Sequence, residues 1–210
     1  MNQAASIRGL FFTTLLALAT PAAAQTGVTA VAGLSLANFH GSDIDIPGLS
    51  RGNRTGVALG AFLDFPLGGI IGARPGLLYA EKGARFTDPS TGDKAGFNLD
   101  YLEIPALLVV AVPTSGSLSP EFFGGPTFAF RIKCAITFSA SGGPSGSADC
   151  PSGSGINSTD FTLLVGAGVR FKSFVAQLAF DFGLSSLDET SDDIKNQAFY
   201  ALVGWMFKLN

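Results

Sequence analysis

The sequence predicts an all-β fold, an eight-stranded antiparallel up-and-down transmembrane β-barrel. Three observations indicate it: apolar side chains alternate with small or polar ones, long and short connections alternate, and charged residues are scarce. Only 14% of the 210 residues are charged, whereas about a quarter are charged in soluble domains. Beyond the N-terminal leader, no uncharged apolar run reaches the roughly 18 residues that a membrane helix needs. The chain is apolar, yet it offers no spanning helix.

The first residues are organised as a secretory signal peptide. Arg8 precedes the apolar run LFFTTLLALAT, and Ala22-Ala23-Ala24 supplies the small residues of a cleavage site. We therefore expect residues 1–24 to be a signal peptide and residues 25–210 to be one exported β-barrel domain. The formal net charge of −3 then becomes −4, and the chain has no basic patch. Nucleic acid is not an expected partner.

Residues 54–65 show the alternation that predicts strands. One face carries Val57, Leu59, Ala61, Leu63 and Phe65, and the other carries Gly56, Ala58, Gly60, Phe62 and Asp64. Such a period of two is typical of a strand with two different environments. It recurs in eight segments, each long enough for the 9 to 11 residues of a tilted membrane strand. The predicted strands are 27–38, 54–65, 69–82, 97–112, 119–133, 158–171, 173–184 and 195–208.

The connections alternate in length along the chain. The first, third, fifth and seventh are long, whereas the second is only PLG and the sixth is a turn around Lys172. An up-and-down barrel places alternate connections at the same end. Outer-membrane barrels have an even number of strands, long extracellular loops and short periplasmic turns. The pattern therefore indicates the outer membrane of a Gram-negative bacterium.

The composition of the two faces indicates which one contacts lipid. The Phe-rich face, with Trp205 near a strand end, fits the outside of a membrane barrel with aromatic girdles. The other face consists of small residues and charges of both signs, which suit a narrow interior that side chains can fill. We expect a plugged lumen with a network of paired charges. Its predicted members are Asp64, Arg74, Glu103, Glu121, Arg131, Asp160, Arg170 and Asp181.

The stretch NLDYLEIPALLVV, residues 98–110, contains the least expected of these charges. Alternation places Glu103 toward the lumen, and we expect it within reach of an arginine such as Arg74 or Arg131. Pro105 cannot donate a ladder hydrogen bond, so we expect a local irregularity beside the carboxylate.

Two cysteines, Cys134 and Cys150, flank a Gly/Ser-rich segment. In an exported protein they are expected to form a disulfide across a flexible loop, 134–157. Closing a loop of about 15 residues contributes roughly 3 kcal/mol in the chain-entropy model. The chain has one histidine, His40, and we expect no metal site and no cofactor.

Two motifs carry a resemblance to a known family. GLLYAEKGARF (76–86), with its Tyr-x-x-Lys-Gly step, precedes LDYLEIPALL (99–108), and Gly125-Pro126 follows in the next strand. The chain resembles the small outer-membrane β-barrel family called porin-like or PorT-like. The resemblance implies a signal peptide, an eight-stranded barrel, outer-membrane residence and insertion by the barrel assembly machinery, but little about activity. The end WMFKLN departs from the usual terminal aromatic residue.

The leading functional hypothesis is a barrel with a side-chain-filled lumen and a structural or surface-interaction role through long extracellular loops. Its expected partners are outer-membrane lipid, lipopolysaccharide and an unidentified surface ligand. One alternative is a narrow porin-like channel for small solutes. Another is a lipid A-modifying enzyme, because His40 lies two residues before Ser42, although we assign no catalytic residue. The last long loop contains an acidic cluster formed by Asp188, Glu189, Asp192 and Asp193. These carboxylates could hold Ca²⁺, or divalent ions could bridge them to lipopolysaccharide, although a solvated loop surface is the simpler interpretation.

Overall fold

The computed structural model describes residues 26–41, 46–151, 153–188 and 194–209. The signal peptide expected at residues 1–24 lies outside them. Nine strands form within this part of the chain. They are β1 (Gly27–His40), β2 (Ser50–Gly68), β3 (Ile71–Thr87), β4 (Lys94–Ala111), β5 (Leu118–Ser139), β6 (Ser145–Asp149), β7 (Thr159–Phe171), β8 (Phe174–Gly183) and β9 (Lys195–Lys208).

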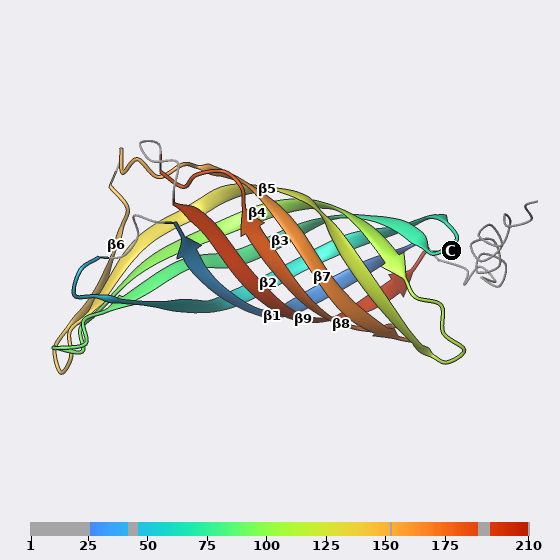
Figure 1. Cartoon of the computed structure of the whole chain (residues 1–210), viewed down its shortest axis with the longest axis horizontal. Coiled ribbons are helices and arrows are strands. Elements are labelled where there is room, and N and C mark those ends of the chain that lie inside the picture. The colour runs from blue at the N-terminus through green and yellow to red at the C-terminus, as the bar shows by residue number, and fades with distance from the viewer. Residues whose placement is uncertain (1–25, 42–45, 152, 189–193, 210) are drawn as a thin grey trace, which may run out of the picture.

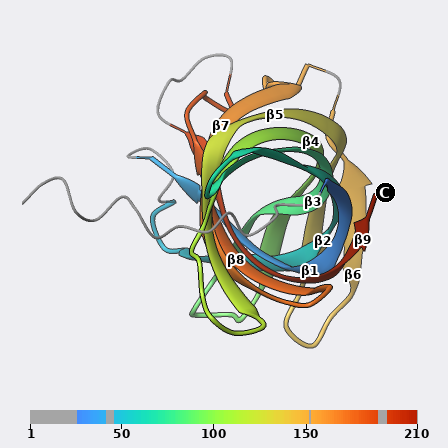
Figure 2. The same ribbon diagram turned by 90° about the vertical axis from the view of Figure 1, so that its right-hand side faces the viewer.

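Eight of these strands close into an antiparallel ring. Each pairs with its neighbours along the chain, β5 pairs with β7, and β1 closes the ring against β9. Figure 2 shows the ring from one end. The eight-stranded up-and-down barrel is therefore confirmed, and closure leaves no unpaired strand edge in the wall. Among the described residues, no helix is long and apolar enough to cross a membrane.

Successive connections of the ring alternate between the two ends of the barrel. The β2–β3, β4–β5 and β7–β8 turns lie at one end, where β9 also ends, and the loops lie at the other (Figure 1). The β3–β4 loop, residues 88–93, is shorter than expected and equals the β4–β5 turn, residues 112–117, because β3 and β4 extend beyond their predicted ends. At the β7–β8 turn Lys172 adopts a left-handed conformation, with φ of 57°. We call the turn end periplasmic and the loop end extracellular, after the arrangement of outer-membrane barrels.

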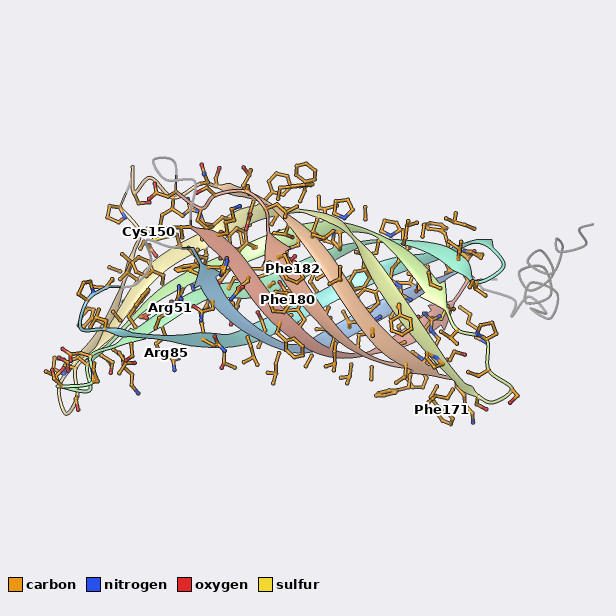
Figure 3. The ribbon with its side chains drawn as sticks, viewed as in Figure 1. Arg51, Arg85, Cys150, Phe171, Phe180 and Phe182 are labelled. Atoms are coloured by element: carbon orange, nitrogen blue, oxygen red, sulfur yellow. A yellow bond between two sulfur atoms is a disulfide. The ribbon has the colours of Figure 1, made fainter. Side chains whose placement is uncertain are left out.

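Side chains alternate between the lumen and the outside as the sequence predicts. On β4, Tyr101 and Glu103 are fully buried, whereas Ile104 and Leu108 are 47% and 59% exposed. The other strands of the wall show the same alternation, with apolar side chains covering the outside (Figure 3). A belt of exposed apolar side chains this large requires lipid around it.

Aromatic side chains mark the edges of this apolar belt. Phe161 and Phe171 both face outward from β7, ten residues apart. At about 3.4 Å per residue and a tilt of about 45°, they are about 24 Å apart along the barrel axis. This matches the apolar band of about 25 Å in outer-membrane barrels. Trp205 and Phe174, paired residues on β9 and β8, are also exposed near the periplasmic end.

One expectation differs from the structure. The segment 134–157 is not one flexible loop, because β5 continues to Ser139 and forms a hairpin with β6. The strand periodicity continues beyond the membrane, where its Gly/Ser composition had concealed it.

The irregularity expected beside Glu103 is present. The pairing of β4 with β3 is interrupted at Ile104 and Pro105, without a change of register. In the β4–β5 ladder the register shifts nearby, between Asp100 and Tyr101.

Candidate functional site: charged layers in the lumen

The periplasmic half of the lumen contains a charged layer centred on Arg74. This arginine is 2% exposed and projects inward from β3. Its Nε donates to Asp64 Oδ1 at 2.7 Å. Its two terminal nitrogens donate to both carboxylate oxygens of Glu121, at 2.7 and 2.9 Å. This two-point geometry is the strong form of an arginine–carboxylate pair.

Three further side chains complete this layer. Arg170 from β7 lies 3.4 Å from Asp64 and 3.3 Å from Glu121. Thr29 Oγ1 donates to Asp64 Oδ2 at 2.6 Å, and Gln177 Nε2 donates to Glu121 Oε1 at 3.0 Å. Two cations thus face two carboxylates, and each carboxylate has additional donors. Charges removed from water require such compensation.

An apolar layer separates this site from the extracellular half of the lumen. Leu78 lies between Arg74 and Lys82 on the inner face of β3 and is 1% exposed. It belongs to a cluster of buried side chains that come from around the ring. The larger members of this cluster are Val31, Phe62, Leu78, Leu107, Val109, Phe123, Leu164, Tyr200 and Leu202.

A second charged layer lies on the extracellular side and is centred on Lys82. Its Nζ is 2.5 Å from Glu103 Oε1 and 2.5 Å from Asp181 Oδ2, and all three side chains are fully buried. In the ring, β8 with Asp181 stands opposite β3 with Lys82, so this contact crosses the lumen. Tyr200 OH donates to Glu103 Oε1 at 3.2 Å. The ammonium also lies 5.5 Å from the centre of the Tyr101 ring.

Asp160 is held beside this layer by uncharged donors. Asn196 Nδ2 donates to Asp160 Oδ2 at 2.9 Å and to Tyr101 OH at 3.1 Å. Ser185 Oγ donates to Asp160 Oδ1 at 2.7 Å. Asp160 therefore joins the network by hydrogen bonds, while the ion pairs are made by the neighbouring groups.

Seven of the eight side chains expected in the lumen thus belong to the two layers or are hydrogen-bonded beside them, while Arg131 makes no ion pair with another described residue. Arg131 Nη2 donates to the backbone oxygen of Ile156 at 2.8 Å and so fastens a long loop. Glu103 faces the lumen as expected, but its partner is Lys82 and not an arginine. Sequence reasoning missed Lys82, although the alternation of Leu78, Ala80 and Lys82 places it on the lumen face.

The periplasmic mouth of the barrel is hollow. A cavity of about 500 Å³ extends from the short turns inward to the Arg74 layer. Arg74, Glu121 and Arg170 line its inner end, while Lys172 and Lys208 lie toward the turns. The lumen is thus open to the periplasm as far as the first charged layer.

The two candidate sites in the loops, the His40–Ser42 pair and the acidic cluster at residues 188–193, lie only partly within the described residues. His40 is the exposed last residue of β1, whereas Ser42 lies outside the described residues. Of the acidic cluster, only Asp188 falls within the described part of the chain, and it pairs with Ile156 in an isolated bridge. The described ranges contain no cluster of three or more metal-binding side chains.

The extracellular end is stiffened by the β5–β6 hairpin and a disulfide. Cys134 and Cys150 are bonded, which confirms the expected pairing, and Cys150 N donates to Cys134 O at 3.1 Å.

In the loop between β3 and β4, the Ser90 hydroxyl and backbone N–H both donate to Asp88. These hydrogen bonds, the hydroxyl's first, lower the pKa of Asp88 from its ordinary value.

This architecture has a counterpart among known sequence families. Residues 24–189 match a family model described as the outer membrane protein beta-barrel domain. The chain belongs to this family. The resemblance inferred from the sequence motifs is therefore confirmed, and the protein resides in the outer membrane, in contact with its lipids.

Solved structures of small outer-membrane barrels are similar in fold. The attachment invasion locus protein Ail of Yersinia pestis is 18% identical, with a TM-score of 0.44, covering 86% of this chain and 99% of that one. Neisserial surface protein A is 14% identical, with a TM-score of 0.44 and coverage of 86% and 97%. OprG of Pseudomonas aeruginosa is 12% identical, with a TM-score of 0.44 and coverage of 88% and 98%. No curated protein matches the sequence.

Proposed function

We propose that the protein is a closed outer-membrane barrel with a structural or surface-interaction role that its extracellular end carries. The pair of charged layers gives this proposal its main support. Each layer joins strands that are not neighbours, by contacts of 2.7 and 2.9 Å between Arg74 on β3 and Glu121 on β5 and of 2.5 Å between Lys82 on β3 and Asp181 on β8. Buried apolar side chains fill the space between the two layers. Arg74 and Lys82 are eight residues apart on β3, which corresponds to about 19 Å along the axis of a tilted strand.

A closed lumen argues against the narrow-channel alternative. A solute that entered the periplasmic cavity would have to separate Arg74 from Glu121 and then Lys82 from Asp181, which faces it across the lumen. Separating a buried pair leaves uncompensated charges and costs about 3–5 kcal/mol. The ion pairs therefore serve as a plug, and we assign no catalytic role to the carboxylates within it.

Current recordings in planar bilayers test the closed state. Folded protein, identified by heat-modifiable gel migration, is expected to show no stepwise current above that of the empty bilayer. A general porin reconstituted in parallel serves as the positive control. Reproducible unitary steps from the wild-type barrel would refute the closed lumen and favour the channel.

The proposed surface role depends on which end faces outward. The β5–β6 hairpin extends the wall beyond the barrel and turns at Gly142 and Gly143, which are exposed. An epitope inserted between these glycines is expected to bind antibody on intact cells. An epitope inserted at Gly116, in the exposed β4–β5 turn, is the matched control and is expected to bind only after the outer membrane is permeabilised. The reverse pattern would overturn the orientation.

A further inference from the structure

A cationic groove lies on the outer wall of the extracellular end, away from the lumen. Its volume is about 390 Å³, and it spans the outer faces of β2 to β5. The side chains that line it include Arg54, Arg85, Lys94, Asn98, Thr137 and Ser139. No carboxylate lines this groove. It therefore combines two cations that are unpaired among the described side chains, and a third that is paired with carboxylates outside the groove, with hydroxyl and amide donors, which together suit a phosphate group.

Two of the three cations are free to bind a ligand. Arg85 and Lys94 are exposed, and within the described residues neither has a carboxylate within ion-pair distance. The buried neighbours Ala84 and Phe86 show that Arg85 projects outward, away from the barrel (Figure 3). In the β3–β4 register Arg85 is opposite Gly96, two residues from Lys94 on the same face. Gly96 is buried and keeps the space between them open.

The third cation is held in place at the membrane-facing edge of the groove. Arg54 Nη2 is 3.2 Å from Asp100 Oδ1 and 3.8 Å from Glu81 Oε2. Its Nη1 donates to the backbone oxygen of Lys82. Tyr79 OH donates to Glu81 Oε1 at 3.3 Å. This polar belt shows where the apolar surface of β3 and β4 ends.

The groove continues the same face of the wall that contacts lipid. On β3, the outward positions run from Leu77, which is 48% exposed, through Tyr79 to Arg85. Tyr79 and Arg85 are six residues apart, so the groove is about 14 Å above the tyrosine along the axis. A lipid whose chains lie against Leu77 and Ile104 would place its headgroup beside the groove. A soluble anion has no acyl chains to pack against Leu77 and Ile104, so this apolar surface would not contribute to its binding.

We infer that the groove binds the phosphorylated headgroup of an outer-leaflet glycolipid. This inference rests on the proposed function, because it assigns a ligand to the extracellular end. In this arrangement Arg85 and Lys94 contact the phosphate oxygens, Thr137 and Ser139 donate further hydrogen bonds, and the acyl chains follow the apolar wall below.

The test compares the variant Arg85→Gln/Lys94→Gln with the wild type in nanodiscs doped with diphosphoryl lipid A. Each cation next to an anionic surface contributes about 1 kcal/mol, which is about fivefold in affinity. The double variant is therefore expected to bind roughly 25-fold more weakly. Lys195→Gln removes a positive charge at the extracellular end of β9, on another part of the wall, and is expected to bind like the wild type. Heat-modifiable migration verifies that each variant is folded.

Two further arms identify the ligand. Dephosphorylated lipid A is expected to bind both proteins equally weakly, and inorganic phosphate is expected not to compete with lipid A at equal concentration. Equal affinity of wild type and double variant, or of the two forms of lipid A, would overturn the phosphate site. Effective competition by inorganic phosphate would overturn the lipid as its source. The bilayer current recordings test the closed lumen independently. A negative result in the lipid A experiment would therefore overturn the proposed binding groove but not the closed lumen.

Discussion

Replacing Lys82 by methionine should destabilise the barrel strongly. Lys82→Met keeps the length and the apolar stem of the side chain. It removes the one cation of the described residues that contacts Glu103 and Asp181, each 2.5 Å away and fully buried. Removing one partner of a buried ion pair costs about 3–5 kcal/mol. Because two carboxylates lose their partner at once, we expect a loss of at least that size in the free energy of unfolding near neutral pH.

The measurement is urea-induced unfolding in lipid vesicles. Trp205 is the only tryptophan and faces outward from β9, so its fluorescence reports removal of that strand from lipid. The triple variant Lys82→Met/Glu103→Gln/Asp181→Asn also removes both carboxylates that contact the ammonium, leaves Asp160 with its uncharged donors, and should recover most of the stability. Lys133→Met, at an exposed position, is the matched control and should change stability by about 0.5 kcal/mol or less.

Two results would refute this reasoning. If Lys82→Met unfolds at the same urea concentration as the wild type, the ammonium is not compensating buried carboxylates. If the triple variant is as unstable as Lys82→Met, the loss arises from packing and not from charge.

Three further predictions concern other parts of the molecule. Val165→Arg, on the outer face of β7 between Phe161 and Phe171, should lower the free energy of unfolding by about 2–4 kcal/mol in the same assay. Thr91→Arg, in an exposed loop, is the control and should change it little. Equal losses in the two variants would contradict the assignment of the lipid face. Cys134→Ser/Cys150→Ser removes a cross-link between residues 16 apart, which contributes roughly 3 kcal/mol in the chain-entropy model. The variant should be cleaved faster within residues 140–149, with unchanged heat-modifiable migration. Unchanged cleavage would show that the disulfide does not order the hairpin. Ser90→Ala should raise the pKa of Asp88 toward its ordinary value, measured by NMR titration, because the hydrogen bonds from Ser90 lower that pKa. The stabilisation from these hydrogen bonds is present above the ordinary pKa of the carboxyl and is lost as the pH falls through the lowered pKa. An unchanged titration curve of Asp88 would contradict the hydrogen bonds.

The sequence predicted the wall of the barrel well because the wall depends on local patterning. Alternation on β4 placed Glu103 inside and Ile104 outside, and the structure agrees. The partner of Glu103 could not be predicted in this way. It depends on the stagger between β3 and β4, and on how far each side chain reaches across the lumen. Alternation gives the face of Lys82 but not its height relative to Asp181 on β8.

The extracellular end shows a second limit of sequence patterning. β6 consists of small polar residues, Ser145–Asp149, and its hairpin forms because β5 offers a free edge above the membrane. Arg131 follows the inward pattern of β5, but the strand has a bulge beside it, where Asp100 pairs with Lys133 and Tyr101 pairs with Arg131. Neither the edge nor the bulge leaves a periodic signal in the sequence.

The central claim is that the lumen is closed between its two charged layers, and thiol labelling tests it most directly. The two native cysteines are joined in a disulfide, so a single introduced cysteine is the only free thiol among the described residues. Leu78→Cys lies between the layers, whereas Ser119→Cys lines the periplasmic cavity. With a water-soluble maleimide applied to folded protein in open membrane fragments, we expect rapid labelling at position 119 and none at position 78. Comparable labelling at both positions would contradict a closed lumen.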